Sequence, residues 1–240
     1  MHDVFFISYR EPNAGDNWRR AKSLVPRARR LDGIEGLVRA YKTAATLSHS
    51  PWFFIIDGDN WLLDASIFDH QPDPPEAAGR LYVWPSRNSL NGLEYGNGAV
   101  KLYSKHAALS VADDVEDFSI AVCQERIKYR TIAAETRIDG SPFQAWRAGF
   151  REGYKLHRRI AAGEGNAERQ YRIWTTRGAD RPNGTYAIAG ARRGHHAFGD
   201  DPKLPINDRS FVEELFEEWR QATDETVINS HRFCSLSSAD

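Results

Sequence analysis

The sequence predicts an α/β protein with a Rossmann-type central mixed sheet flanked by helices and a helical C-terminal part. Three observations support this fold class. Strand-like and helix-like segments alternate in the first sixty residues, large apolar residues run together at 52–56, and long amphipathic segments follow residue 140. Such alternation favours parallel strands joined by crossover helices, and an unbroken apolar run suits a strand buried on both faces.

The N-terminal elements follow one another without long gaps. We expect a strand at 4–8, a helix near 17–24, a short strand around 28–31, a helix over 34–47 and a strand at 52–56. The second helix is predicted because its apolar residues recur three and four positions apart. Strand, helix, strand, helix, strand is the order of a Rossmann-type half.

Beyond residue 80 the pattern changes. Residues 81–84 are predicted to form a strand that Pro85 ends, and 100–103 another extended segment after a glycine-bearing loop. We expect a long helix over 142–160, which has Pro in its first turn. Two further helical patterns lie around 189–196 and over 210–222.

Neither internal repeats nor low-complexity segments are evident, so we expect one domain over 1–240. Its nucleotide and metal half would cover about 1–105, and an acceptor half with the C-terminal helices about 106–240.

Composition bounds the class of protein. With 240 residues, 41% hydrophobic and 12% aromatic, the chain suits a folded globular protein, and no window approaches a membrane span. The net charge of −1 excludes a global basic field, although Lys and Arg cluster locally. Cys123 and Cys234 fit neither a metal spacing nor a disulfide framework, and the start lacks a signal-peptide pattern. We therefore expect a cytoplasmic location.

The most informative motif follows the apolar run. The predicted strand stops at Asp57-Gly58-Asp59. Ligands of open α/β sheets collect just beyond the carboxyl ends of the strands. Two carboxylates there, with a glycine that lets the backbone bend, are able to hold a hard divalent cation beside a phosphate. The alternative is a polar turn that simply ends a strand.

The early half that ends in Asp-x-Asp resembles the nucleotide-sugar half of GT-A glycosyltransferases. Further blocks resemble glycosyltransferase-like proteins of tailed bacteriophages and extend the resemblance over most of residues 4–200. The matching blocks are Phe6–Asn13, Asp57–Asp59, Val83–Asn88, Leu93–Leu102 and Arg181–Ala191. The chain departs from this pattern at Tyr95–Ala99, where a Tyr-Gly-Tyr-Gly-Gly type of sequence is expected.

The resemblance implies a GT-A-like, metal-dependent hexosyl- or pentosyltransferase. It would move a sugar from a nucleoside-diphosphate sugar, with UDP-sugars favoured, to a hydroxyl acceptor. Mn²⁺ or Mg²⁺ would bridge the diphosphate, with Asp59 as the main ligand and Asp57 against the ribose or a metal-bound water. His195 and His196 would complete the metal shell, and Arg192 or Arg193 would neutralise the leaving diphosphate. A basic surface loop is the alternative for the two histidines.

In such a sheet the loop after the first strand lies next to the carboxylate-tipped strand. Ser8, Tyr9, Arg10 and Glu11 would bind the nucleoside together with Asp57 and Gly58, with Tyr9 stacked on the base. A polar loop fixed by a proline explains these residues equally well.

The acceptor hydroxyl needs a base to take its proton. Glu94 and Asp114 are the two candidates, and both also fit solvated positions.

The resemblance implies 5-hydroxymethylpyrimidine in phage DNA as the favoured acceptor, inside the host cytoplasm. A base in a duplex must be extruded to reach such a pocket. Two alternatives stay open: transfer to a protein or a small glycan, and a non-catalytic phage module that binds a nucleotide or carbohydrate. No membrane partner is expected, and the sequence leaves the donor sugar and the oligomeric state open.

Overall fold

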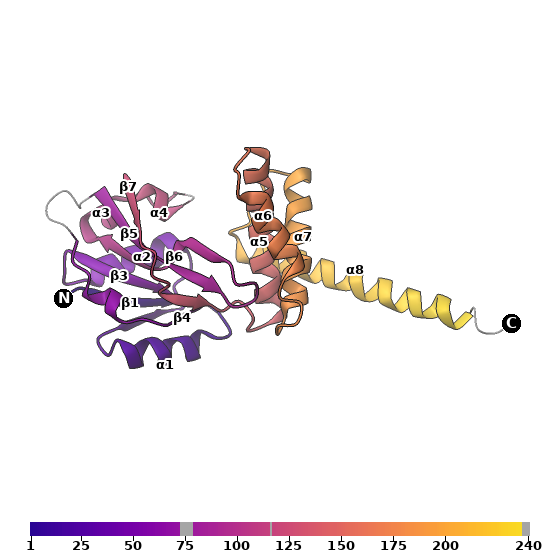
Figure 1. Cartoon of the computed structure of the whole chain (residues 1–240), viewed down its shortest axis with the longest axis horizontal. Helices are drawn as coiled ribbons and strands as arrows, with labels where there is room; N and C mark the ends of the chain where they lie inside the picture. Colours follow the sequence, from indigo (N-terminus) through magenta and orange to yellow (C-terminus); the bar gives the residue numbers. More distant parts are fainter. Residues whose placement is uncertain (73–78, 116, 237–240) are drawn as a thin grey trace. The chain divides into compact units, whose positions relative to one another are not determined.

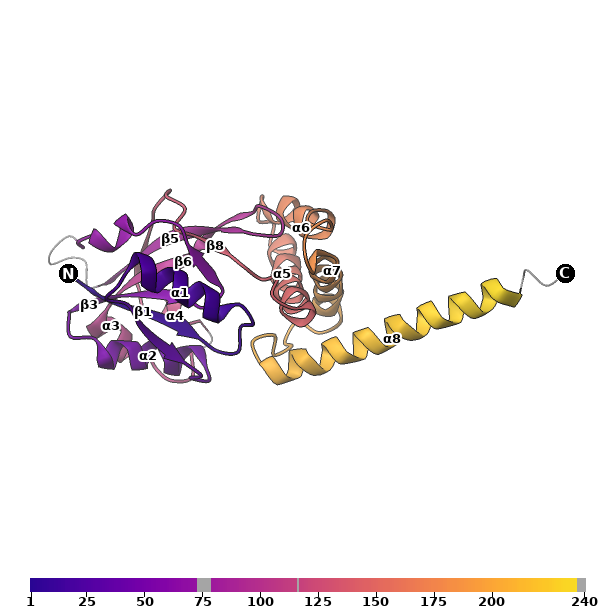
Figure 2. The ribbon, with the colours of Figure 1, turned by 90° about the horizontal axis from the view of Figure 1, so that it is seen from below.

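A computed structural model describes residues 1–72, 79–115 and 117–236, with the side chains of 95–98 and 224–236 outside the description. The chain forms two compact units, Met1–Gly140 (unit 1) and Ser141–Asp240 (unit 2) (Figures 1 and 2). The sequence predicts a single domain whose halves meet near residue 105, whereas the boundary between the compact units lies at residue 140. Among the described helices, none is long and apolar enough to cross a membrane.

Unit 1 is built on one mixed sheet. Its strands are β1 (Asp3–Ser8), β2 (Arg29–Asp32), β3 (Trp52–Asp57), β4 (Asn60–Leu62), β5 (Arg80–Asn88), β6 (Glu94–Ser104), β7 (Glu125–Lys128) and β8 (Ala134–Thr136). The order is β2-β1-β3-β6-β5-β8-β4, and β7 also pairs with β5. Strand β1 runs parallel to β2 and β3, whereas β6 is antiparallel to both β3 and β5. The predicted α/β class with a central mixed sheet is confirmed.

Helices cover both faces of this sheet. They are α1 (Ala14–Leu24), α2 (Leu37–Leu47), α3 (Lys105–Ser110) and α4 (Phe118–Ala121), with a 3₁₀ turn η1 (Ser66–Asp69). Alternate residues of β3 enter separate cores: Phe54 packs in a cluster with Ala21 of α1, and Phe53 in a cluster with Tyr41 of α2. The apolar run at 52–56 therefore reflects a strand covered on both faces, as the sequence predicts.

One strand prediction is wrong. Pro85 does not end its strand, because β5 continues to Asn88. The register shifts between Trp84 and Ser86, so the proline occupies an irregularity where no ladder donor is needed. Its carbonyl still accepts a hydrogen bond from the Ala133 amide at 2.9 Å.

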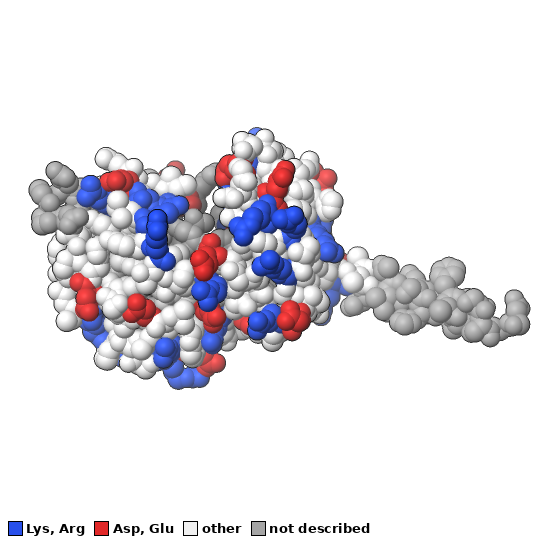
Figure 3. Space-filling view, viewed as in Figure 1, with Lys and Arg blue, Asp and Glu red and all other residues white. Residues whose placement is uncertain are grey.

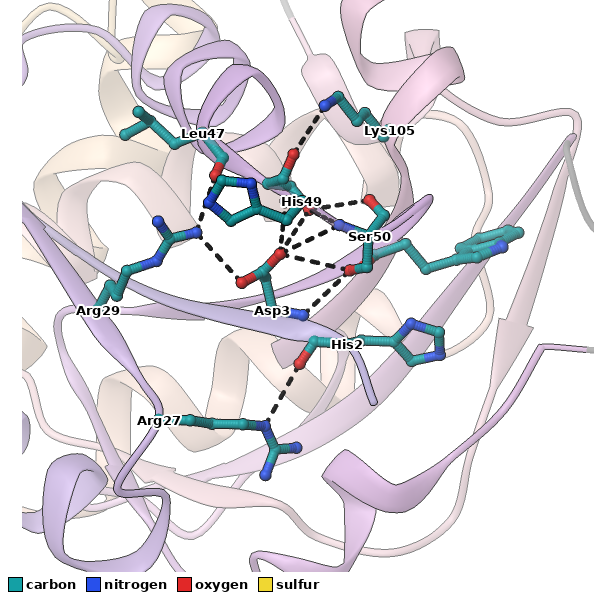
Figure 4. A network of polar contacts seen from close by, with 10 residues as sticks. His2, Asp3, Arg27, Arg29, Leu47, His49, Ser50 and Lys105 are labelled. Carbon is teal, nitrogen blue, oxygen red and sulfur yellow. Dashed lines mark hydrogen bonds and ion pairs between the residues drawn. The ribbon is translucent and has the colours of Figure 1, made fainter.

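Asp3 ties together the amino ends of β1 and β3. Its carboxylate accepts hydrogen bonds from the backbone amides of His49 at 2.7 Å and Ser50 at 3.2 Å, and pairs with Arg29 at 3.2 Å (Figure 4). Burial opposes ionisation, but the hydrogen bonds outweigh it and lower the pKa of Asp3. This network fixes the strand ends opposite those that carry Asp57.

Unit 2 consists of the helices α5 (Pro142–Ala161), α6 (Ala167–Thr176), α7 (Gly184–Asp200) and α8 (Arg209–Leu236). The helix predicted over 142–160 is confirmed as α5, which begins where the Ser141 side chain accepts a hydrogen bond from the Gln144 amide at 3.1 Å. Helix α7 contains the pattern at 189–196, so the loop alternative for His195 and His196 is wrong.

Helices α5 and α7 approach each other through glycines on both sides. The four positions are Gly149 and Gly153 of α5, and Gly190 and Gly194 of α7. A Cβ atom on Gly149 would lie 2.0 Å from the carbonyl oxygen of Ala187, and one on Gly194 would lie 2.0 Å from that of Phe150. Glycine is required at these positions because any side chain would push the two backbones apart.

Candidate functional site

Two segments meet at the carboxyl edge of the sheet: the loop that follows β1 and the turn at 57–59 that follows β3. They are neighbours because β1 and β3 are adjacent and parallel. Gly58 marks the contact, since a Cβ atom there would lie 2.8 Å from the Ile7 carbonyl oxygen and 3.0 Å from Oε2 of Glu11. A side chain does not fit at position 58, and the Glu11 carboxylate lies against the turn.

Polar groups from elsewhere hold this turn in place. Asn17 of α1 is fully buried, and its Nδ2 donates to the Gly58 carbonyl at 3.0 Å. The Arg137 amide donates to the Asp59 carbonyl at 2.7 Å, while Asn13 Nδ2 donates to the Arg137 carbonyl at 2.8 Å. Among the described residues, Oδ1 of Asn17 has no hydrogen-bond partner. The turn is thus fixed, with a buried oxygen beside it left unsatisfied.

Asp57 is engaged through both carboxylate oxygens. Nζ of Lys101 on β6 lies 2.6 Å from Oδ2, and the Tyr41 hydroxyl donates to Oδ1 at 2.6 Å. Lys101 is only 6% exposed and Tyr41 only 1%. Burial, followed by the charge of Asp57, raises the pKa of Tyr41 well above its ordinary value, so its hydroxyl stays a donor at neutral pH.

The Asp59 carboxylate lies near other negatively charged side chains. Its Oδ1 accepts a hydrogen bond from Asn60 Nδ2 at 2.8 Å. Burial, then the negative charges of Asp57 and Glu11, raise the pKa of Asp59 to about 7. The Asp57 and Glu11 carboxylates thus oppose ionisation of Asp59, and a bound cation would favour it.

These residues suit a hard cation, which prefers oxygen ligands and is often held by one or two carboxylates plus phosphate. Over the described ranges, no group of three or more His, Cys, Asp or Glu side chains is arranged to hold a metal ion. A cation bound here would therefore complete its shell with water or with oxygens of a ligand.

The other predicted nucleoside-binding residues lie in the same loop. Ser8 Oγ donates to Asp32 Oδ1 at 2.5 Å, so this hydroxyl is engaged at the β1–β2 edge. The Tyr9 amide donates to Oε2 of Glu11 at 2.7 Å. Arg10 is exposed and has a left-handed backbone with φ of 60°, with its guanidinium 5.2 Å from the centre of the Tyr9 ring. A non-glycine residue in this region indicates a constrained loop.

The two candidate bases lie elsewhere in unit 1. Glu94 begins β6, is exposed and pairs with Arg87 across the hairpin at 3.4 Å. Asp114 is exposed between α3 and α4. Within the described part of the chain, no hydrogen bond or ion pair links either of them to Asp57 or Asp59. Their role as a base stays a prediction.

The remaining predicted residues belong to α7 in unit 2. The His195 ring stacks on Tyr171 at 4.1 Å and lies 4.3 Å from the His157 ring. Burial, then His157 and His196, lower the pKa of His195, which favours the neutral imidazole. Arg192 donates to the Thr175 carbonyl at 3.0 Å. A contribution of Arg192, His195 and His196 to a metal or diphosphate site stays a prediction.

Sequence reasoning missed Asn17, Tyr41 and Lys101. One of them leaves a signal: Lys101 is a single charge inside the apolar stretch 99–103, and a buried lysine requires an anionic partner. Tyr41 instead has the spacing of an ordinary core residue, and Asn17 that of an exposed helix position.

No protein-family model matches the chain, and the comparison with curated proteins finds no match. Among solved structures, the chain is similar to the mannosyltransferase PcManGT from Pyrobaculum calidifontis in complex with GDP-Man and Mn²⁺. The identity is 12%, the TM-score is 0.43, and the alignment covers 95% of this chain and 83% of that one.

Two further similarities cover a smaller part of the chain. The bifunctional IspDF from Campylobacter jejuni has 11% identity and a TM-score of 0.35, with 56% of this chain and 52% of that chain covered. HddC from Yersinia pseudotuberculosis has 13% identity and a TM-score of 0.34, with 57% and 89% covered. Similarities this distant carry no argument about activity, which has to be inferred from the geometry of the site.

Proposed function

We propose that this chain is a metal-dependent glycosyltransferase that moves a sugar from a nucleoside-diphosphate sugar to a hydroxyl acceptor. The supporting observation is the carboxylate cluster of Glu11, Asp57 and Asp59 at the carboxyl edge of β1 and β3. Carboxylates at a ligand-binding edge repel a diphosphate unless a cation lies between them. The cluster therefore supports a cation-bridged diphosphate.

The residues of the site have separate tasks in this proposal. The carboxylates hold Mn²⁺ or Mg²⁺, which when bound supplies positive charge that stabilises the departing diphosphate. Tyr9 offers a ring face for the nucleoside base, and Arg10 offers a guanidinium beside it. Glu94 or Asp114 takes the proton of the acceptor hydroxyl as that oxygen bonds to the sugar.

For the acceptor we propose 5-hydroxymethylpyrimidine in DNA, with a UDP-sugar as the favoured donor. The charge of the helical segment supports a nucleic acid: residues 141–199 hold eleven Lys and Arg against four Asp and Glu. Figure 3 shows basic side chains gathered over α5–α7. The exposed ones are Arg158, Arg169, Arg172, Arg177, Arg181, Arg192 and Arg193. Arginine suits phosphate contacts because its planar fork binds two oxygens at once.

The test of the activity is donor hydrolysis. The full chain is incubated with Mn²⁺ and a panel of UDP- and GDP-sugars, and release of nucleoside diphosphate is measured. We expect slow hydrolysis of one donor, abolished by Asp59→Ala and unchanged by Glu35→Ala, which removes an exposed carboxylate in the same unit. Absence of donor binding by calorimetry contradicts the proposal, and donor binding without turnover for any acceptor indicates the non-catalytic module.

The acceptor is tested separately by mass spectrometry of hydroxymethylated DNA incubated with the chain and the hydrolysed donor. A mass increase of one sugar per modified base supports DNA as the acceptor. Unmodified DNA with every donor removes it, and transfer to proteins or small glycans is then assayed in the same way.

A further inference from the structure

The charge of unit 2 is divided between its helices. Residues 167–199, which include α6 and most of α7, hold six arginines against two carboxylates, Glu168 and Asp180. The described side chains of α8, residues 209–223, instead hold four glutamates against two arginines. This separation of sign gives α6 and α7 a positive field that attracts an anionic partner.

Four arginines form what we call the α6–α7 surface: Arg169, Arg172, Arg177 and Arg192. Arg169 and Arg172 lie three positions apart on α6, so they share one face of that helix, and Arg177 follows its end. Arg192 of α7 donates a hydrogen bond to the Thr175 carbonyl at 3.0 Å, which places it beside the last turn of α6. All four residues are exposed, and Figure 3 shows Lys and Arg side chains gathered over α6 and α7.

The charge of these four guanidinium groups is not neutralised by carboxylates. Within the described chain, the ion pairs of unit 2 join Lys155 to Glu152, Arg159 to Glu164, Arg181 to Asp180 and Arg220 to Glu217. None of these pairs includes a residue of the α6–α7 surface. Arg192 donates to a carbonyl, but a guanidinium has five N–H donors and keeps its charge in doing so. The surface is therefore able to bind an anion.

The composition of the surface favours nucleic-acid phosphates as that anion. Surfaces that bind membranes insert apolar side chains between their basic residues, and protein interfaces have an apolar and aromatic centre. Every exposed large apolar residue of the described chain lies in unit 1. The basic residues of 167–199 are all arginine, apart from two histidines, and the planar fork of arginine binds two phosphate oxygens at once.

The aromatic rings of α6 and α7 favour a duplex over a single strand. Proteins that bind single strands expose rings on which unpaired bases stack. In α6, Trp174 is 2% exposed, and the Tyr171 ring stacks on His195. In α7, Tyr186 packs against the rings of α8, and Phe198 against Tyr154 of α5. These rings are engaged within unit 2, whereas the arginines face solvent and suit the phosphates of a paired backbone.

We infer that the α6–α7 surface binds the phosphate backbone of duplex DNA without reading its sequence. Contacts of arginine with phosphates position a protein on a duplex but carry no sequence information. The inference rests on the proposed function for the choice of DNA as the polymer. It goes beyond that function because binding at this surface requires neither Mn²⁺, nor a sugar donor, nor a hydroxymethylated base. For Arg192, it replaces the diphosphate of the donor with a phosphate of the polymer.

The test measures binding of the full chain to a fluorescein-labelled duplex of unmodified DNA by fluorescence anisotropy. The buffer contains EDTA and no donor, and the salt concentration is varied. Four phosphate contacts predict that the logarithm of the binding constant falls against the logarithm of the salt concentration with a slope of about −3 to −4. A hydroxymethylated duplex of the same sequence should give the same slope, since the contacts are made to phosphates.

Single substitutions test the assignment to the α6–α7 surface. Arg169→Gln and Arg172→Gln should each reduce the steepness of the slope by about one and weaken binding about five-fold at physiological salt, because each removes one phosphate contact. The matched control is Arg220→Gln, which removes the same charge from an exposed arginine of unit 2 that is paired with Glu217 at 2.7 Å. It should leave the slope unchanged. Circular dichroism checks that each variant is folded.

Several results would overturn the inference. Equal losses for Arg172→Gln and Arg220→Gln mean that only net charge matters, and tighter binding of a single strand of the same length removes the duplex. Binding to phosphatidylserine vesicles without binding to DNA removes nucleic acid as the partner. A parent chain that hydrolyses a donor but does not bind the duplex overturns this inference and leaves the glycosyltransferase intact. Duplex binding with the expected slope, but without binding of any donor, overturns the proposed function alone.

Discussion

The two units of this chain differ in how closely the backbones of their packed elements approach one another. In unit 1, large side chains fill the space between sheet and helices: Phe53 and Phe54 are fully buried, and Tyr41 and Tyr103 are 1% exposed. In unit 2, the backbones of α5 and α7 meet at four glycines, with no side chain between them. Side chains separate the packed elements of unit 1, whereas α5 and α7 are in backbone contact, and the large side chains of Trp146 and Phe150 pack in a cluster with Phe216 of α8.

The two kinds of contact should be destabilised by opposite changes in side-chain size. A core filled by large side chains is damaged when atoms are removed, because a cavity remains. A helix pair in backbone contact is damaged when atoms are added, because the helices must separate.

The largest effect is expected in the sheet. Phe54→Ala removes a fully buried ring that packs against Phe68 and Trp84, and should lower the free energy of unfolding of unit 1 by about 3–5 kcal/mol. Urea denaturation followed by circular dichroism measures the loss. Phe54→Leu, which leaves a smaller void, should cost less. Equal costs for both variants would contradict a volume-filled core.

A single added methyl group should damage unit 2. Gly149→Ala places a Cβ atom where the Ala187 carbonyl oxygen is 2.0 Å away, and should cost about 1–3 kcal/mol. The matched control is Gly165→Ala, because nothing lies within 4 Å of a Cβ atom there, and its effect should stay within about 1 kcal/mol. Urea denaturation of both variants measures the difference, and equal stabilities would show that the helices are not in backbone contact.

Without metal, the pH dependence of stability that Asp59 contributes to unit 1 should be opposite in sign to the dependence that His195 contributes to unit 2. The pKa of Asp59 is raised to about 7 in the folded chain, so the folded state binds more protons than the unfolded one between about pH 4 and pH 7. The Asp59 contribution therefore destabilises unit 1 increasingly as the pH rises through this window, by less than about 1.4 kcal/mol per pH unit. Asp59→Asn removes this dependence.

In unit 2 the sign is reversed for His195. Its pKa is lowered, so the stability it contributes is present above its ordinary value and is lost as the pH falls. Hydrogen exchange of each unit in EDTA, compared between parent, Asp59→Asn and His195→Gln over pH 5–8, measures both slopes. Slopes of the same sign for the two residues would contradict the electrostatic assignments.

The smallest effect concerns helix capping. Ser141 caps the twenty-residue helix α5 through a 3.1 Å hydrogen bond, whereas Ser104 caps the six-residue helix α3 of unit 1 through one of 3.4 Å. Ser141→Ala should cost about 1 kcal/mol, and Ser104→Ala should cost less because its bond is longer. Thermal unfolding of the two variants is the measurement, and a larger loss for Ser104→Ala would reverse the expected order.

Some parts of the fold could be predicted because their signal is local. The apolar run of β3 and the amphipathic spacing of α5 extend over enough residues to show a period. Strands β4 and β8, each three residues long, are too short to show one. Pro85 was misassigned because a proline is tolerated at an irregularity in the pairing, and pairing depends on the neighbouring strand.

The candidate site also combines features with a local sequence signal and features that depend on distant segments. The α/β class and the position of Asp57 and Asp59 at a strand end could be predicted from the sequence, because hydrophobic periodicity and turn residues are properties of adjacent positions. The contacts of Asp57 with Lys101, 44 residues away, and with Tyr41, 16 residues away, depend on the three-dimensional fold, as does the position of the Glu11 carboxylate at Gly58. The pairing of the glycines of α5 with those of α7 also depends on the fold. Contacts between distant segments follow from strand register and helix packing, and neither is encoded in the spacing of residues along one segment.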